Sequence, residues 1–129
     1  MTPVVLDTCV VLWLAGRQEA LSVTARTLLT DPNTVLYASA ISAWEIAVKA
    51  RKGRLGLPST PHVWWETFLR SFPVKEVAVT AAIAMNAVDE KLPHGDPADR
   101  IIVATARYLQ AKLVTADSVL RESVPFTAW

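Results

Sequence analysis

The sequence predicts an α/β fold with a mainly parallel central sheet. Short apolar segments rich in β-branched residues, typical of buried strands, alternate along the chain with longer segments of helical periodicity. This alternation is the pattern of a parallel sheet packed against helices. Asp7 and Asp117 follow two of the apolar segments, at the sheet edge where folds of this class bind their ligands.

Each strand is predicted from a short aliphatic run that ends at a polar or turn-forming residue. The first run ends at Asp7, and the fourth ends just before Asp117. The third segment alternates only weakly between apolar and polar residues. The predicted strands are residues 3–6, 34–38, 74–79, 112–115 and 126–128.

Each helix is predicted from apolar periodicity and from residues that begin or end helices. Ser22 is placed as an N-cap, Thr60 as an N-cap followed by Pro61 at the first helical position, and Gly53 as a stop. The predicted helices are residues 8–15, 22–30, 41–52, 60–72, 80–88 and 98–110, with a short helix before the last strand.

The third helix is predicted to bury one particular face. Ile41, Trp44 and Val48 follow the spacing of three and four residues that places side chains on one side of a helix. Glu45 lies beside this face and not on it. We therefore expect Trp44 in the core.

The remaining helical tryptophans are assigned from their neighbours. Trp13 lies in an apolar segment and is expected in the core. Trp64 and Trp65 are adjacent, and adjacent helical residues point about 100° apart. The pair therefore either fills the core or leaves one ring exposed at the surface.

The composition is that of one ordered domain. A chain of 129 residues fits a single compact domain, residues 1–129, that buries a core without disulfides. Hydrophobic residues make up 52% and charged residues 19%, which excludes a disordered chain. Cys9 is the single cysteine, its neighbours do not favour a thiolate, and no CxxC motif or His-rich tract indicates zinc.

The sequence shows no sign of secretion or membrane insertion. No basic stretch precedes the first apolar run, unlike a signal peptide. The apolar runs are shorter than the roughly 18–20 residues that span a bilayer. We therefore expect a soluble, cytoplasmic protein.

The net charge of +1 does not indicate a class of partner, so nucleic-acid binding has to be argued from a site. One local basic cluster comprises Lys49, Arg51, Lys52 and Arg54. It is either a solvated helix end, favoured by the helix dipole, or a patch that contacts phosphates.

Four acids are predicted to converge at one edge of the sheet. Asp7 and Asp117 follow the first and fourth strands, and Glu45 and Asp99 occupy the first turns of helices that lead away from the same edge. Each acid also has an alternative role. Asp7 and Asp117 precede helices as N-caps do, and Glu45 fits a capping box that begins at Ser42. The site prediction therefore depends on the acids coming together.

Carboxylates held within a few ångströms repel one another and are costly to bury unless a cation neutralises them. Such oxygen ligands favour Mg²⁺, with Mn²⁺ as a substitute. An ion of this kind lowers the pKa of water and stabilises the charge that develops in phosphodiester hydrolysis. The four acids therefore predict Mg²⁺-dependent phosphodiester chemistry.

Motifs around the four acids follow one another in an order and spacing typical of a known family. They are VLDTC (5–9) with Leu12 and Trp13, SAWEIAVK (42–49) with 53–55, LPHGDPADRIIVATA (92–106) and LVTAD (113–117). With them, the chain resembles PIN-domain ribonucleases of the VapC toxin type over nearly its whole length.

The resemblance implies a PIN-like α/β/α sandwich with the four acids at one end. It assigns Asp7 and Asp99 as Mg²⁺ ligands, and Glu45 and Asp117 as residues that complete the pocket and bind or activate water. It also implies a homodimeric toxin that cleaves a structured RNA such as tRNA or rRNA. A VapB-type antitoxin would lay a peptide across the pocket, with a basic side chain in place of the metal.

The resemblance selects Asp99 and not Asp96 as the third acid, because the family places this acid seven residues before a small residue, here Ala106. Asp96 is left as the N-cap of the helix, with Pro97 at the first helical position, or as an outer member of the site.

Several polar residues near the acids are candidates for supporting roles. Thr8 and Thr115 either hold water or phosphate or pack at strand ends. Ser42 is either a site residue or a helix cap. Arg100 contacts the substrate backbone, restrains a carboxylate or forms a surface ion pair, and His94 is expected to be solvated.

Two other functions compete with the nuclease. A PIN-like binding module without activity would have the same fold, but all four acids are present. A receiver-like phosphotransferase would need two adjacent acids after the first strand, whereas Asp7 is followed by Thr8.

Overall fold

The computed structural model describes residues 1–93 and 95–129, so His94 lies outside the described residues. Five strands form one sheet in the order β3-β2-β1-β4-β5, and every neighbouring pair is parallel. The strands are β1 (Thr2–Leu6), β2 (Thr34–Ser39), β3 (Val74–Val77), β4 (Lys112–Val114) and β5 (Thr127–Ala128). The predicted parallel α/β class is confirmed, and the third strand ends two residues earlier than predicted.

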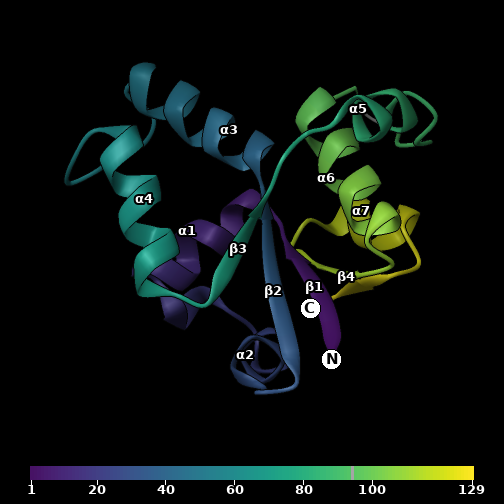
Figure 1. The fold of residues 1–129 in the computed structure, drawn as a ribbon, viewed down its shortest axis with the longest axis horizontal. Coiled ribbons are helices and arrows are strands. Elements are labelled where there is room, and N and C mark those ends of the chain that lie inside the picture. Colours follow the sequence, from purple (N-terminus) through teal and green to yellow (C-terminus); the bar gives the residue numbers. More distant parts are fainter. Residues whose placement is uncertain (94) are drawn as a thin grey trace.

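Helices lie on both sides of the sheet, with α1 to α4 on one side and α5 to α7 on the other (Figure 1). No helix in the described ranges is long and apolar enough to cross a membrane. The helices are α1 (Thr8–Gly16), α2 (Val23–Thr30), α3 (Ala40–Arg51), α4 (Pro61–Ser71), α5 (Ala81–Ala87), α6 (Pro97–Tyr108) and α7 (Ser118–Ser123), with a short 3-10 helix at Gln18–Ala20.

The order of the strands creates a switch point at the centre of the sheet. From β1 the chain moves outward through β2 and β3, and then returns to place β4 on the other side of β1. Ligands of open parallel sheets bind at the carboxyl ends of strands that flank such a reversal. Asp7 follows β1 and Asp117 follows β4, so both acids lie at this point.

The alternation of side chains along β1 supplies two hydrophobic cores. Val4 and Leu6 pack with residues from α1 to α4, whereas Val5 packs with residues from α6 and α7. Successive residues of a strand point to opposite faces, which explains this division. The central strand is therefore held on both sides, and the position of Asp7 at its end is well supported.

Most predicted helix ends are confirmed. The Ser22 hydroxyl accepts a 3.0 Å hydrogen bond from the backbone N–H of Ala25, and Thr60 caps α4 with Pro61 in its first turn. Gly53 follows α3 with a φ of 70°, in the left-handed region that favours glycine.

The predicted orientation of α3 is wrong. Trp44 is 60% exposed, and the helix buries Ser42 and Ile46 instead. Ile41 and Val48 are only half-buried. Periodicity assigns serine to the outside, but the Ser42 hydroxyl has a hydrogen-bond partner and can therefore be buried, which turns Trp44 toward solvent.

The capping box predicted from Ser42 to Glu45 is also wrong. The N-cap of α3 is Ser39, whose hydroxyl accepts a hydrogen bond from the backbone N–H of Ile41. Strand β2 ends at this residue and passes into the helix without a loop. Ser42 and Glu45 therefore lie inside the helix and have other partners.

The other tryptophans lie near the core of the α1 side. Trp65 is buried and its indole N–H donates a 2.7 Å hydrogen bond to Glu76. Trp64 is half-buried and stacks on Phe68, with ring centroids 5.6 Å apart. Trp13 was predicted to lie in the core. It packs against this core but is only half-buried.

Candidate active site

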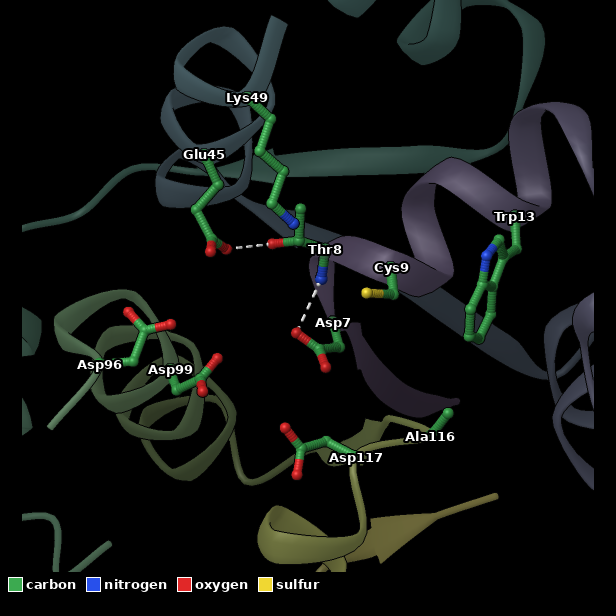
Figure 2. A pocket seen from close by; sticks show the side chains of 10 residues that line it. All are labelled: Asp7, Thr8, Cys9, Trp13, Glu45, Lys49, Asp96, Asp99, Ala116 and Asp117. Carbon is green, nitrogen blue, oxygen red and sulfur yellow. Dashed lines mark hydrogen bonds between the residues drawn. The ribbon is translucent and has the colours of Figure 1, made fainter. Parts of the chain in front are cut away.

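A pocket of about 370 Å³ opens where the carboxyl ends of β1 and β4 meet the first turns of neighbouring helices. Figure 2 shows side chains from α1, α3, α6 and the β4–α7 connection around it. It brings the four predicted acids together with the candidates Thr8 and Asp96. The lining residues are Asp7, Thr8, Cys9, Trp13, Glu45, Lys49, Asp96, Asp99, Ala116 and Asp117.

Asp7 is buried and held through both carboxylate oxygens. Its Oδ1 accepts a 2.8 Å hydrogen bond from the backbone N–H of Thr8, and its Oδ2 accepts a 2.7 Å bond from the hydroxyl of Thr115. Burial raises the pKa of Asp7, and the two hydrogen bonds partly oppose this effect. Asp7 is thus both the N-cap of α1 and a fixed acid at the pocket floor.

Glu45 is tied to α1 across the pocket. The Thr8 hydroxyl donates a 2.5 Å hydrogen bond to Oε1 of Glu45, and the same hydroxyl lies 2.8 Å from Oγ of Ser42. Burial raises the pKa of Glu45, while the Thr8 hydrogen bond and the charge of Lys49 lower it. Ser42 is not among the lining residues and contacts the pocket wall through Thr8.

Asp117 caps α7 and also faces the pocket. Its Oδ1 accepts hydrogen bonds of 2.8 and 3.2 Å from the backbone N–H groups of Val119 and Leu120. Its own backbone N–H donates to the hydroxyl of Thr115 at 3.1 Å. The capping role and the site position predicted for Asp117 are thus compatible in one conformation.

Asp96 and Asp99 share the beginning of α6. Oδ1 of Asp96 accepts a 3.0 Å hydrogen bond from the backbone N–H of Ala98, which confirms the predicted N-cap. Asp99 lies one turn inside and is half-buried. Burial, and then the charges of Asp7 and neighbouring carboxylates, raise the pKa of Asp99 to about 7. The charged form of Asp99 is therefore disfavoured in the metal-free pocket.

Arg100 is not among the residues that line the pocket. Its guanidinium donates to the backbone carbonyl of Glu90 and, at 3.5 Å, to that of Leu92. The carboxylate of Glu90 in turn accepts bonds of 2.9 and 3.0 Å from Arg107. Arg100 therefore supports the segment that leads into α6 and does not serve as a pocket residue.

The PIN domain family matches residues 4–123. The chain belongs to the PIN domain family. Ribonuclease VapC22 from Mycobacterium tuberculosis is 36% identical to it over the full length of both proteins. The family expected from the sequence motifs is confirmed.

Solved structures support the fold of this PIN domain. A toxin–antitoxin complex from Klebsiella pneumoniae matches with a TM-score of 0.66 and 23% identity, over 98% of this chain and 96% of the other. VapBC2 from Rickettsia felis, bound to a fragment of promoter DNA, matches with a TM-score of 0.69 and 13% identity over the same shares. At these identities the likeness concerns the α/β/α architecture alone.

Lys49 lines the pocket of this PIN domain, whereas the sequence placed it only in a basic cluster and not in the site. It lies one helical turn after Glu45 on α3, a spacing that places two side chains on the same face. Its charge lowers the pKa of Asp7 as well as that of Glu45. Within the described ranges its amine forms no ion pair shorter than 4.0 Å. The spacing from Glu45 is the signal that would have identified it.

Cys9 also lines the pocket and is exposed. Burial of the thiol, followed by the charges of Asp7 and other acids, raises its pKa. A high pKa keeps the sulfur protonated, and the thiolate is the reactive form. The charge of Lys49 lowers this pKa, but the net shift is upward, as expected for neighbours that do not favour a thiolate.

The pocket of this PIN domain has the donor chemistry of a site for a hard divalent cation. In the described residues, no three His, Cys, Asp or Glu side chains already converge closely enough to hold an ion. The pKa values of Asp7, Glu45 and Asp99 are nevertheless all raised, by burial and by other acids nearby. A cation would offset this cost, and carboxylate oxygens are the ligands Mg²⁺ prefers.

Proposed function

We propose that this PIN domain is an endoribonuclease toxin that depends on a divalent cation and is neutralised by a VapB-type antitoxin. The observation that carries the proposal is the single pocket that Asp7, Glu45, Asp99 and Asp117 line from four separate segments. The 36% identity to a ribonuclease over the whole chain supports it. We take residues 1–129 as one PIN domain.

Mg²⁺ is the proposed cofactor, with Mn²⁺ as a substitute, and Asp7 and Asp99 are its proposed ligands. When bound, the ion supplies charge stabilisation for phosphodiester hydrolysis. Asp7 suits this role because two hydrogen bonds already fix its orientation. Asp99 suits it because its charge, disfavoured by burial and by neighbouring acids, would be stabilised by a cation.

Glu45 and Asp117 are the proposed partners of the attacking water. Oε1 of Glu45 holds the Thr8 hydroxyl, so the proton of the water would pass to Oε2. Oδ1 of Asp117 accepts the two capping bonds of α7, so its Oδ2 would orient the water. Asp96 adds negative charge at the rim as an outer member of the site.

The basic residues of α3 are the proposed contacts for RNA phosphates. Lys49 lines the pocket, while Arg51, Lys52 and Arg54 are exposed beyond it along the end of the helix. A phosphate near the acids would pair with the Lys49 amine, and the exposed side chains would follow the strand outward. A tRNA or an rRNA is the proposed substrate, which places the reaction in the cytoplasm.

The antitoxin is proposed to bind across the pocket and an adjoining apolar groove. Leu12, Leu55, Leu57 and Trp64 line this groove of about 380 Å³, and Trp13 lines both the groove and the acidic pocket. A peptide with apolar side chains in the groove would therefore reach the acids within a few residues. A basic side chain of that peptide would neutralise them in place of the metal.

A homodimer is proposed for the free toxin. Met85 on α5, Val88 just after it and Tyr108 at the end of α6 are 67%, 78% and 60% exposed. Helices α5 and α6 pack against each other, so these apolar side chains lie on neighbouring elements. Exposed apolar surface of this kind is typical of contacts between subunits.

A binding module without activity is the alternative function. It would need no acids in the pocket, whereas all four acids of the family pattern line it here. The nuclease is therefore the better supported of the two.

The test is RNA cleavage by the purified protein, with RNA ends mapped after brief expression to find the substrate. We expect cleavage with Mg²⁺ or Mn²⁺, none with EDTA, and none by Asp99→Asn at unchanged secondary structure. Asp89→Asn is the matched control, because Asp89 is exposed and lies outside the pocket. Cleavage by Asp99→Asn at the wild-type rate would refute the site, and cleavage in EDTA would refute the metal.

A further inference from the structure

We propose that Ser42 acts through Thr8 to position Glu45, and is therefore a positioning residue of the nuclease. The inference rests on the function proposed above, since it concerns the same pocket. Ser42 does not itself line the pocket, but it contacts the lining residue Thr8. Its effect has to pass through the side chain that joins it to Glu45.

The three side chains form a chain of hydrogen bonds from the core to the pocket. Ser42 is fully buried and Thr8 is 2% exposed, while Glu45 is half-buried at the pocket wall. Oγ1 of Thr8 lies 2.8 Å from Oγ of Ser42 and 2.5 Å from Oε1 of Glu45. Figure 2 shows the bond between Thr8 and Glu45 crossing from α1 to α3.

The number of hydroxyl hydrogens fixes the direction of this chain. Thr8 carries one hydroxyl hydrogen, and it donates that hydrogen to the Glu45 carboxylate. The Thr8 oxygen can therefore only accept from Ser42, so the Ser42 hydroxyl is the donor. The Ser42 hydroxyl thus donates to Thr8, and the Thr8 hydroxyl donates to Glu45. The observed Thr8 rotamer satisfies both bonds.

The arrangement makes Thr8 the link between two acids. Its backbone N–H holds Oδ1 of Asp7, and its side chain holds Oε1 of Glu45. The first contact is set by the backbone of α1, but the second depends on the Thr8 side-chain rotamer. Ser42 stabilises that rotamer from the buried side of α3. Without it, the Thr8 hydroxyl is free to turn away from Glu45, and the carboxylate is free to move.

The first test compares Ser42→Ala with Ser39→Ala. Both serines are on or beside α3 and fully buried, but the Ser39 hydroxyl caps the helix and does not contact Thr8. We expect Ser42→Ala to lower kcat by about 10–100-fold, with a smaller change in KM, as is usual for residues that orient a catalytic group. Ser39→Ala should keep the wild-type kcat. Equal losses in the two variants would overturn the proposal.

The second test asks whether Ser42 acts through Thr8. Thr8→Val keeps the shape of the side chain and removes the hydroxyl, so it should lose at least as much activity as Ser42→Ala. The double variant should lose no more than Thr8→Val alone, because residues that act through one another are not additive. Thr8→Ser keeps a hydroxyl and should therefore retain most of the activity that Thr8→Val loses. Additive losses would contradict the proposed chain.

The third test does not depend on cleavage. Three-bond NMR couplings to the Thr8 methyl carbon report the side-chain rotamer, and we expect one rotamer in the wild type and in Ser39→Ala. Averaged couplings in Ser42→Ala would support the proposal even if no RNA were cut, an outcome that would refute only the nuclease function. A single unchanged rotamer in Ser42→Ala would overturn it, as would averaged couplings together with a wild-type kcat.

Discussion

The hydroxyl of Thr115 donates a 2.7 Å hydrogen bond to Oδ2 of Asp7, and the two residues follow adjacent parallel strands. The same hydroxyl accepts a 3.1 Å bond from the backbone N–H of Asp117. One buried side chain therefore fixes the acid after β1 relative to the acid after β4. Asp7 and Thr115 are far apart in the sequence, so this hydrogen bond forms only when β1 and β4 pair in the folded sheet.

Replacing Thr115 with valine should damage the site more than the fold. The change keeps the shape but removes the donor to Asp7 and the acceptor for Asp117. We expect activity to fall by about 10–100-fold and the free energy of unfolding to fall by about 1–3 kcal/mol. Cleavage kinetics and urea unfolding measure the two effects.

Thr105→Val is the control for this change. Thr105 is also fully buried, but its hydroxyl donates to the carbonyl of Ile101 on its own helix. This variant should cleave RNA at the wild-type rate. Wild-type kinetics in Thr115→Val would show that Asp7 does not need the tie.

The stability of the metal-free protein should decrease as the pH rises. Asp99 has an ordinary pKa of 3.8 and a folded-state pKa of about 7, so the folded protein holds this proton more tightly than the unfolded chain. Between these values the free energy of unfolding falls with increasing pH. Asp7 and Glu45 shift in the same direction and add to the slope. Unfolding in EDTA at about pH 5 and about pH 7.5 measures it.

Asp99→Asn should flatten this pH dependence, because asparagine carries no titrating proton. It should also abolish the stabilisation that Mg²⁺ gives the wild type at neutral pH, since binding to the folded state raises stability. Asp89→Asn leaves the pocket intact and should behave as wild type. An equally steep slope in Asp99→Asn would show that another group causes it.

Lys49→Met should weaken RNA binding, because the Lys49 amine lies at the pocket where a phosphate would approach the acids. Lys52→Met removes an exposed charge from the same helix end and should have a smaller effect. Anisotropy of labelled RNA in the Asp99→Asn background avoids cleavage. Loss of one phosphate contact should reduce the slope of log affinity against log salt by about 0.7. An unchanged affinity and slope would exclude the contact.

Leu57→Glu should weaken binding of the antitoxin without loss of nuclease activity. Leu57 lines the apolar groove beside the pocket, and a charge there would be buried by the proposed peptide. Val23→Glu is the control, because Val23 is 80% exposed at the start of α2. Calorimetry with the antitoxin measures affinity, and RNA cleavage confirms that the variant is folded. Equal affinity in both variants would argue against the groove.

The strands and helices were predictable because each has a local signal, although that of the third strand is weak. Aliphatic runs gave the strands, and caps such as Ser22 and Thr60 gave the helix starts. The acids at the carboxyl ends of β1 and β4 followed from the topology of parallel sheets. These features depend on residues that are close together in the sequence.

The orientation of α3 was not predictable in the same way. Its buried face is chosen by Ser42, whose partner Thr8 lies 34 positions earlier in the sequence. Hydrophobic periodicity treats a serine as polar and therefore placed Trp44 inside. The same contact explains why Glu45 reaches the pocket from a helix interior and not from a capping box.

Three acids of the pocket, Asp7, Asp96 and Asp117, are also the N-caps of α1, α6 and α7. A lineage that lost its nuclease would still need those helix starts. Asparagine, serine and threonine also cap helices, whereas alanine does so poorly. In such a lineage we therefore expect short polar residues to persist at these three positions. Glu45 and Asp99 cap no helix of the described residues, so they should be the first acids to be replaced by residues of any kind.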